Sequence, residues 1–371
     1  MRKIFLTIDW LTVLPVLAVT IMGLIVLISF NINEIPSVNQ SLIIKHAISI
    51  VLGLIIVIII SQIDYRAFST LIQPLFFGII TLLILVLIFG DRINGAKSWF
   101  SVGVFNLQPG EFAKIVVVLI VAHYFSRYHH KINSFISIIL SLLPVLVIVF
   151  LILLQPDFGT AIILLLLWLG MLVFGGVKLR HIIVLILTGV LSITSLWLWV
   201  FKEYQKQRIL TFLNPTSDPL GSGYNILQSM RSVSSGGLMG VNELSIPVPE
   251  IHTDFIFSGF AQQWGFIGVS IYFSLILLII GRIMYIGLKS QDTFPKMIIL
   301  GVILSILIQL IINIGMNIGV LPITGVPLPF MSYGGSSMLV YWILIGLVLS
   351  IQKHKLSKGT IFMKDFQDIF G

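Results

Sequence analysis

A single carboxylate, Asp254, lies where the longest polar segment of a very apolar chain meets the apolar run that begins at Phe255. An ionisable group inside hydrocarbon costs about 2.5 to 3.5 kcal/mol at the centre of a spanning helix and less near its ends, so such a group is a candidate functional residue. A carboxylate there could accept a proton from a substrate hydroxyl. His252 could tune it or make only a local hydrogen bond. The alternative for Asp254 is an N-cap of the following helix, which the spacing fits equally well.

Two further sites carry acidic residues next to apolar runs. Pro109 and Glu111 suit the N-terminus of a helix, and Glu111 and Lys114 are three residues apart, on one helical face. They could form a buried ion pair that locks two helices, or a charged wall of a substrate cavity. Asp157, within Gln155–Thr160, interrupts another apolar run. It could cap the next helix, or it could be a cavity carboxylate that supports a catalytic one or holds a cation.

The polar segment 202–253 carries fixed cations, among them Lys206, Arg208 and Arg231. Ammonium and guanidinium groups recognise anionic phosphate, so these side chains are candidates for binding a phosphorylated substrate. For each of them a solvated loop surface is the simpler interpretation.

A second elaborate segment, 325–337, combines three glycines and two prolines with Ser332 and Tyr333. It predicts a re-entrant polar loop shielded by neighbouring helices, because irregular backbone at membrane depth is tolerated only there. The alternative is a set of small residues that serve close helix packing.

These residues must be positioned by membrane-spanning helices. The chain has 371 residues, of which 57% are hydrophobic and 10% are charged, and no soluble single domain tolerates this without large exposed apolar patches. Runs of about 20 apolar residues cross a ~30 Å hydrocarbon core as helices. We therefore predict an all-α, polytopic membrane protein with about ten spans, at residues 9–30, 42–62, 69–90, 111–126, 134–154, 158–176, 181–201, 255–286, 297–320 and 334–352. The run from Phe255 exceeds what one span needs and predicts a helix that tilts or projects.

The charge distribution sets the orientation. With the N-terminus inside, 14 of the 22 lysine and arginine residues fall on the cytoplasmic side, as the positive-inside rule requires. The net charge of +8 therefore needs no nucleic-acid partner. We predict one domain spanning 1–371, both termini in the cytoplasm, a long extracytoplasmic loop at about 202–253 between the seventh and eighth helices, and a cytoplasmic tail at about 353–371. The first apolar run is interpreted as a retained helix, not a cleaved signal peptide.

Several kinds of chemistry lack support in the sequence. The absence of cysteine excludes disulfides, thiol chemistry and cysteine-bound metal. No P-loop, HExxH or GxSxG pattern is present, so nucleotide-driven transport and hydrolysis by these motifs are not indicated.

Six motifs in order resemble those of the SEDS (shape, elongation, division and sporulation) family, the RodA/FtsW/SpoVE group of bacteria, over nearly the whole chain. They are Gln108-Pro109-x-Glu111-x-x-Lys114, Gln155-Pro156-Asp157-x-Gly159-Thr160, Asp218-Pro219-x-Gly221-x-Gly223-Tyr224, His252-Thr253-Asp254-Phe255-Ile256-Phe257, Asn313-Ile314-Gly315-Met316 with Leu321-Pro322-x-Thr324-Gly325, and Pro327-Leu328-Pro329-Phe330-x-Ser332-Tyr333-Gly334-Gly335-Ser336-Ser337.

The resemblance implies ten transmembrane helices in the cytoplasmic (inner) membrane of a bacterium and peptidoglycan glycosyltransferase activity. The substrates would be lipid II and a glycan chain on undecaprenyl diphosphate, and the partner a class B penicillin-binding protein. Asp254 matches the family's essential aspartate, and Glu111, Lys114 and Asp157 match its intramembrane charged positions. The segment 204–208 looks more like the RodA branch, which favours cell elongation and its machinery over an FtsW-like division role.

Some positions depart from the family pattern. Lys97 is displaced by one residue from the basic position before Trp99, because Ser98 stands between them. Gln262 and Gln263 occupy positions where relatives commonly carry acids. If those acids assist catalysis or bind a cation, this protein would either be slow or depend on Asp254 and Asp157 alone.

The resulting hypothesis is that Asp254 takes the proton from the 4-hydroxyl of the N-acetylglucosamine of lipid II, while Lys114, Arg208 and Lys97 stabilise the leaving diphosphate. The sequence identifies no certain cofactor, and a divalent cation, Mg or Mn, is compatible with the reaction. The alternatives are a flippase for lipid-linked precursors and a non-catalytic scaffold for a penicillin-binding protein.

Overall fold

The structure is a computed structural model. It describes residues 8–33, 35, 37–93, 96–102, 105–128, 134–199, 210–219, 221, 223–241, 246 and 248–370.

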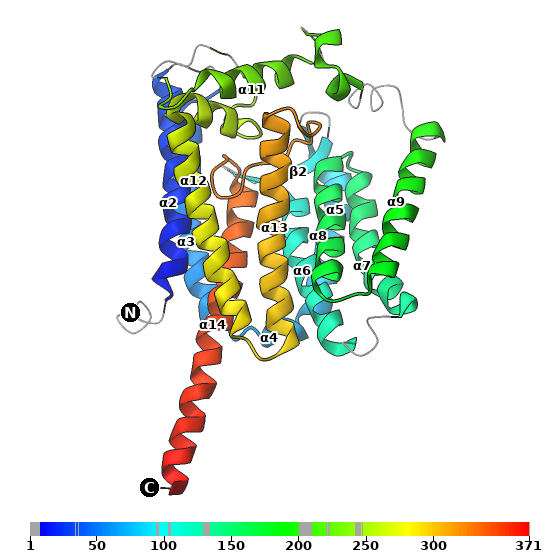
Figure 1. The fold of residues 1–371 in the computed structure, drawn as a ribbon, viewed down its shortest axis with the longest axis vertical. Helices are drawn as coiled ribbons and strands as arrows, with labels where there is room; N and C mark the ends of the chain where they lie inside the picture. Colours follow the sequence, from blue (N-terminus) through cyan, green and yellow to red (C-terminus); the bar gives the residue numbers. More distant parts are fainter. Residues whose placement is uncertain are drawn as a thin grey trace.

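Ten long helices form the body of the part of the chain that the structure describes (Figure 1). They are α2 (Trp10–Ile32), α3 (Gln40–Gln62), α5 (Ile72–Phe89), α6 (Pro109–Tyr128), α7 (Phe135–Leu153), α8 (Phe158–Phe174), α9 (Leu179–Trp199), α12 (Ile256–Leu288), α13 (Thr293–Asn317) and α14 (Gly335–Phe370). Eight of them are long and apolar enough to cross a membrane, and two shorter apolar helices, Phe158–Phe174 and Leu179–Leu191, lie at the positions of the sixth and seventh predicted spans. The protein is a polytopic helical membrane protein, and the full count of ten spans stays a prediction.

The helix ends follow the local sequence signals. Pro109 begins α6 and Glu111 lies in its first turn, where the missing N–H and the negative charge are both favourable. Asp157 is the N-cap of α8, and its side chain accepts a hydrogen bond from the backbone N–H of Thr160. The N-cap interpretation of Asp157 is confirmed.

The connection before α6 contains a small sheet that the sequence did not indicate. Its antiparallel strands, in the order β1-β2-β3, are β1 (Asp91–Ile93), β2 (Ala96–Val102) and β3 (Phe105–Leu107). A hydrogen bond from the Gln108 N–H to the Ser336 hydroxyl, 2.8 Å long, ties the end of this sheet to the start of α14.

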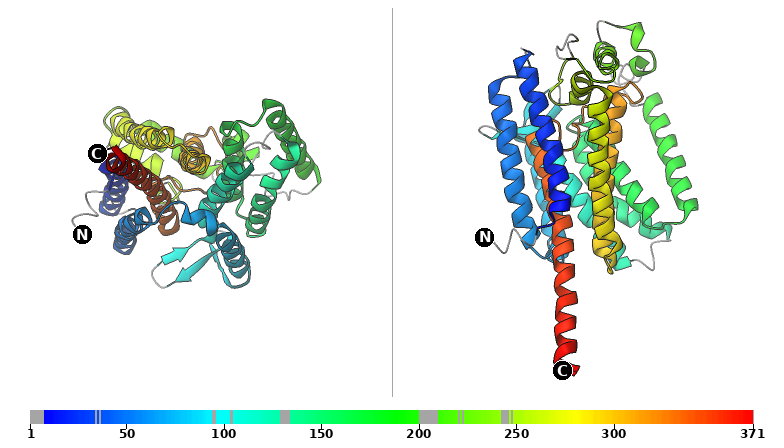
Figure 2. Two further views of the ribbon diagram at one scale, coloured as in Figure 1. Left: turned by 90° about the horizontal axis from the view of Figure 1, so that it is seen from below. Right: turned by 60° about the vertical axis from the view of Figure 1, so that its left-hand side comes forward.

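The helix α11 (Tyr224–Ser235) lies across one end of the bundle (Figures 1 and 2), which we call the α11 end. Two shorter helical elements are η2 (Pro215–Ser217) and α4 (Ala67–Thr70). At the opposite end α14 continues as one helix to Phe370 and projects beyond the bundle.

The excess length of α12 has a specific cause. Gly265 has φ 59° and ψ −164°, which no residue inside a helix adopts, so α12 is two helical pieces joined at Gly265. The first piece is almost fully buried, whereas Phe266 and Ile267 are exposed immediately after the break. The helix is therefore broken, which the predicted tilt or projection did not describe.

The connection between α13 and α14 is irregular and largely buried. Val326, Leu328, Phe330 and Met331 are each at most 2% exposed, and Phe330 has a positive φ of 63°. Side-chain amides of α13 bind its backbone, as described below. The segment has the shielded, irregular backbone that the sequence predicted.

Candidate active site

Asp254 lies in the turn that precedes α12. The N-cap of α12 is Phe255 and makes no side-chain cap, so the structure does not place Asp254 in the capping role that its spacing allowed. The Asp254 side chain is partly exposed, and its Oδ2 would lie 3.5 Å from a Cβ placed on Gly325. The carboxylate therefore faces the irregular segment between α13 and α14.

The backbone around Asp254 is held at three successive carbonyls. The carbonyl of His252 accepts from the Tyr333 N–H at 3.0 Å, and that of Thr253 accepts from the Ser332 hydroxyl at 2.6 Å. The Asp254 carbonyl accepts from the side-chain amides of Asn313 at 2.9 Å and Asn317 at 3.1 Å. Ser332 and Tyr333 of the predicted re-entrant loop thus support the backbone next to Asp254, and a role for them in substrate binding stays a prediction.

The supporting amides come from one face of α13. Gln309, Asn313 and Asn317 are four residues apart, and their amides bind the backbone carbonyls of Pro327, Val326 and Asp254. Sequence reasoning did not select Gln309 or Asn317. A polar residue at every fourth position of an otherwise apolar span was the available signal, because such a stripe lies on one face.

The surroundings of Asp254 favour its neutral form. Burial, and after it the negative charges of Glu250 and Asp157, raise the pKa of Asp254 to about 7, against the opposing effect of a hydrogen bond from Thr253. A carboxyl group with a pKa near the working pH suits a general base, since it is both available as the anion and able to keep the proton it takes.

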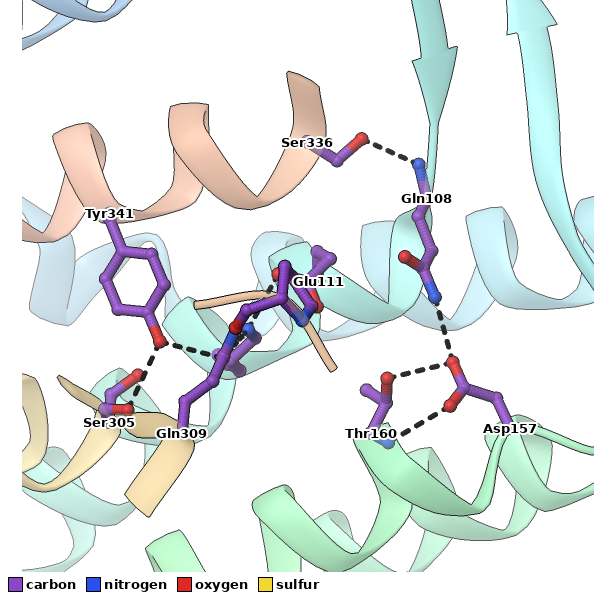
Figure 3. Close-up of polar contacts among 10 residues, drawn as sticks. Gln108, Glu111, Asp157, Thr160, Ser305, Gln309, Ser336 and Tyr341 are labelled. Atoms are coloured by element: carbon purple, nitrogen blue, oxygen red, sulfur yellow. Dashed lines mark hydrogen bonds and ion pairs between the residues drawn. The ribbon is translucent and has the colours of Figure 1, made fainter. Parts of the chain in front are cut away.

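Asp157 is a second carboxylate near the same site. Its Oδ2 accepts hydrogen bonds from the Gln108 amide at 2.9 Å and from the Thr160 hydroxyl at 2.8 Å (Figure 3). Burial and then the charge of Glu111 raise the pKa of Asp157, while the hydrogen bonds from Thr160 and Gln108 lower it. Its hydrogen bonds anchor it to the start of α8, so it acts on Asp254 through its charge.

Lys114 is fully buried, in contrast to its predicted place beside a leaving group. Its Nζ lies 2.7 Å from Glu111 Oε2 and 2.5 Å from Gln309 Oε1. Gln309 Oε1 also accepts from the Tyr341 hydroxyl at 2.7 Å, within the network drawn in Figure 3. The geometry favours the buried ion pair over the cavity wall, because both charges are satisfied inside the protein.

The other predicted cations are not joined to Asp254 by any contact of the described residues. Lys97 donates a 2.8 Å hydrogen bond to the carbonyl of Ile88 at the end of α5. Its neighbour Trp99, an uncharged candidate, pairs with Asp91 in the sheet. Lys206 and Arg208 lie outside the described residues.

His252 lies beside Glu250 and Tyr333. Its Nε2 is 3.9 Å from Glu250 Oε2, and its ring centroid is 5.9 Å from that of Tyr333. Burial lowers the pKa of His252, and the charge of Glu250 opposes this effect.

Gln262 and Gln263 serve packing within the described residues. Gln262 Oε1 accepts from the Ser232 hydroxyl of α11 at 2.9 Å, and the Gln263 amide donates to the Ser29 hydroxyl of α2 at 2.8 Å. They therefore connect α12 to its neighbours.

No group of three His, Cys, Asp or Glu side chains among the described residues is arranged to hold a metal ion. The divalent cation considered above stays a prediction, and we derive no step through one.

Comparison with known proteins identifies the family. A family profile described as cell cycle protein, covering FtsW, RodA and SpoVE, matches residues 9–357. The chain is a member of the SEDS family. This SEDS protein is 36% identical to the peptidoglycan glycosyltransferase MrdB of Escherichia coli, over 84% of this chain and 86% of that protein. It is 33% identical to the peptidoglycan glycosyltransferase RodA of Treponema pallidum, over 94% and 98% of the two chains.

Solved structures agree with this assignment. A chain from a structure of a peptidoglycan synthase complex that coordinates polymerization and crosslinking matches the SEDS protein with a TM-score of 0.81 and 30% identity, covering 94% of this chain and 98% of that one. The rod shape determining protein RodA of Thermus thermophilus matches with a TM-score of 0.68 and 27% identity, covering 93% and 96%.

Proposed function

We propose that this SEDS protein is a peptidoglycan glycosyltransferase that polymerises lipid II into glycan strands on the outer face of the bacterial cytoplasmic membrane. The proposal rests above all on Asp254, a carboxyl group with a pKa of about 7 whose backbone is fixed at three carbonyls. The relatives' names support the reaction class. The basic residues support an orientation with both termini in the cytoplasm, which puts α11 and Asp254 outside.

Asp254 would act as the general base. It takes the proton from the 4-hydroxyl of the lipid II N-acetylglucosamine as that oxygen bonds to the anomeric carbon of the chain on undecaprenyl diphosphate. The bond between the anomeric carbon and the diphosphate oxygen breaks, and the diphosphate leaves with the electron pair. Positioned base catalysis contributes about 10²- to 10⁴-fold to the rate.

The leaving diphosphate needs positive charge more than it needs a proton. Lys206 and Arg208 are our candidates, together with Lys97. Lys114 is not a candidate for binding the diphosphate, because its ammonium group is buried against Glu111 and Gln309. Lys114 instead supports the segment that faces Asp254, since Gln309 also binds the Pro327 carbonyl.

The biological setting is part of the proposal. Resemblance to RodA-type relatives favours a role in cell elongation with the elongation machinery, and the match to a chain of a peptidoglycan synthase complex supports a class B penicillin-binding protein as partner.

The decisive experiment is polymerisation of purified lipid II by the wild type, Asp254→Asn and Asp254→Ala, each co-purified with the partner and with its transpeptidase blocked. We expect glycan chains from the wild type and none from the two variants. Asp292→Asn is the matched control, because Asp292 is the N-cap of α13 and lies at the opposite end of that helix from Asn317, which binds Asp254. This variant should keep its activity. Unchanged chains from Asp254→Asn would overturn the base assignment, and labelled lipid II crossing the bilayer without polymerisation would favour a flippase.

A further inference from the structure

The break in α12 at Gly265 is filled by another segment of the chain, Gly236–Val241, which we call the 236–241 loop. A helix break frees backbone groups that must find new partners. The freed N–H groups of Phe266 and Ile267 donate to the carbonyls of Gly237 and Leu238, at 2.9 and 3.1 Å. On the other side of the break, the Gln262 carbonyl accepts from the Val241 N–H at 2.9 Å. The loop is therefore docked into α12 by backbone hydrogen bonds on both sides of Gly265.

Close backbone contact is what requires glycine at this junction. A Cβ on Gly265 would lie 2.3 Å from the Gly240 nitrogen, and one on Gly240 would lie 1.9 Å from the Gln263 carbonyl oxygen. Both residues also have positive φ. The backbone of the loop therefore contacts the backbone of the helix directly. The position of the loop relative to the membrane is fixed by the position of this part of α12.

The position of the break at Gly265 along the bundle axis can be compared with the neighbouring residues of α2. The Gln263 amide donates to the Ser29 hydroxyl, and α2 ends at Ile32, almost one turn nearer the α11 end. Ile28 is 40% exposed and Ile32 is 74% exposed on this candidate span, so both face hydrocarbon. Because α12 runs away from the α11 end, Phe266 and Ile267 lie deeper than Gln263. The 236–241 loop is consequently at or below the edge of the apolar layer.

The side chains of the loop fit that location. Leu238 is 71% exposed and Met239 is 82% exposed, next to Phe266 at 65%. The sequence Gly-Gly-Leu-Met-Gly-Val carries no charge and no polar side chain. The Gly240 N–H donates to the Gly236 carbonyl at 2.8 Å, so the loop also satisfies part of its own backbone. Exposed backbone without partners would be costly in hydrocarbon.

We propose that the 236–241 loop is a lipid-binding hook, in which Leu238 and Met239 insert among the acyl chains of the leaflet at the α11 end. The occupant of this surface is the bilayer itself. Its role is to hold α11, whose last residue Ser235 directly precedes the hook, at a fixed height on the bundle.

The absence of cysteine makes the proposal directly testable. Met239→Cys, and separately Leu238→Cys, would be labelled with the fluorophore NBD and the protein reconstituted in phosphatidylcholine and phosphatidylglycerol vesicles. Quenching would be measured with lipids that carry a doxyl group on the acyl chain and with aqueous iodide. Phe266→Cys, on the exposed face of α12, is the lipid-facing control, and Ser217→Cys, in exposed η2, is the aqueous control.

We expect doxyl quenching at positions 238 and 239 to be within about twofold of that at Phe266→Cys, and iodide quenching to be several-fold weaker than at Ser217→Cys. Iodide quenching equal to that at Ser217→Cys, without doxyl quenching, would overturn the proposal. A label that neither agent quenches would also overturn it, in favour of a protein neighbour at this surface.

Discussion

The side-chain amide of Asn317 donates a 3.1 Å hydrogen bond to the backbone carbonyl of Asp254, which is 63 residues earlier in the chain. The same side chain accepts from the Ser258 N–H at 3.1 Å, and the Asn317 backbone carbonyl accepts from the Ser229 hydroxyl of α11 at 2.8 Å. Asn317 thus joins α11, α12 and α13 directly behind the candidate base.

Replacing Asn317 should therefore harm catalysis through the position of Asp254. In Asn317→Ala the Asp254 carbonyl keeps its bond from Asn313 and the Ser258 N–H keeps its bond to the Phe255 carbonyl, so each group loses one of two partners. Each lost hydrogen bond costs about 0.5–1.5 kcal/mol. We expect the polymerisation rate to fall about 10- to 100-fold, as is usual when a catalytic group is misplaced by about 1 Å. Initial rates with lipid II and thermal unfolding of the same samples would separate the two effects. Asn33→Ala, which removes a side-chain amide that donates to the Ser29 carbonyl within α2, is the control and should have a near-normal rate.

The pKa of Asp254 predicts the pH dependence of the reaction. A base must be ionised, and a carboxyl group with a pKa of about 7 is mostly protonated below pH 7. The rate should fall about tenfold per pH unit on the acidic side of pH 7 and level off above it.

Glu250→Gln tests the cause of that pKa. Removing the Glu250 charge removes one of the influences that raise the pKa of Asp254, so the acidic limb of the pH profile should move to lower pH. Profiles of kcat/KM for the wild type, Glu250→Gln and Asp292→Asn would be compared. A limb that stays in place, or moves to higher pH, would contradict the electrostatic account.

Substitutions at Glu111 and Lys114 distinguish a buried structural ion pair from charges that line a substrate cavity. Lys114→Met leaves the Glu111 charge buried without its partner, which should cost about 3–5 kcal/mol of stability. The double variant Glu111→Gln with Lys114→Met removes both charges and should recover most of that loss. Thermal unfolding in detergent and lipid II polymerisation would be measured for all three proteins. A double variant that is stable but inactive would show that the charges take part in the reaction.

Because α12 is broken at Gly265, replacing Gly265 by alanine should destabilise the protein far more than replacing Gly281 in the same helix. Gly265→Ala introduces a Cβ 2.3 Å from the Gly240 nitrogen at a φ of 59°, where strain alone costs about 1–3 kcal/mol. Gly281→Ala, also in α12, would meet nothing within 4 Å and should be neutral or stabilising by up to about 1 kcal/mol. Thermal unfolding of both variants checks this. Equal stability of the two would mean that the loop does not dock into the break.

The features that the sequence predicted well are those with a local cause. Apolar runs of spanning length predicted the helices, and the start of α6 at Pro109 and the N-cap at Asp157 follow from neighbouring residues. Asp254 was selected as a candidate for a similarly local reason, because a charge at the end of an apolar run is costly wherever the chain folds.

The features that were missed depend on distant partners. Asn317 acts on a carbonyl 63 residues away, and Lys114 is buried because Gln309, 195 residues away, completes its shell. No window of sequence contains both members of such a pair. The strands of the small sheet are only three to seven residues long, too short for an alternating pattern to be distinctive.

A chain of hydrogen bonds connects the hook at 236–241 to the backbone of Asp254. Hydrogen bonds lead from Val241 to the Gln262 carbonyl, from Ser232 to the Gln262 side chain, and from Ser229 to Asn317, which holds Asp254. A segment seated in one leaflet is displaced when that leaflet becomes thinner or thicker, and the displacement passes along this path to the carboxylate. We therefore expect the polymerisation rate to pass through a maximum as the acyl chains of the vesicle lipids are lengthened.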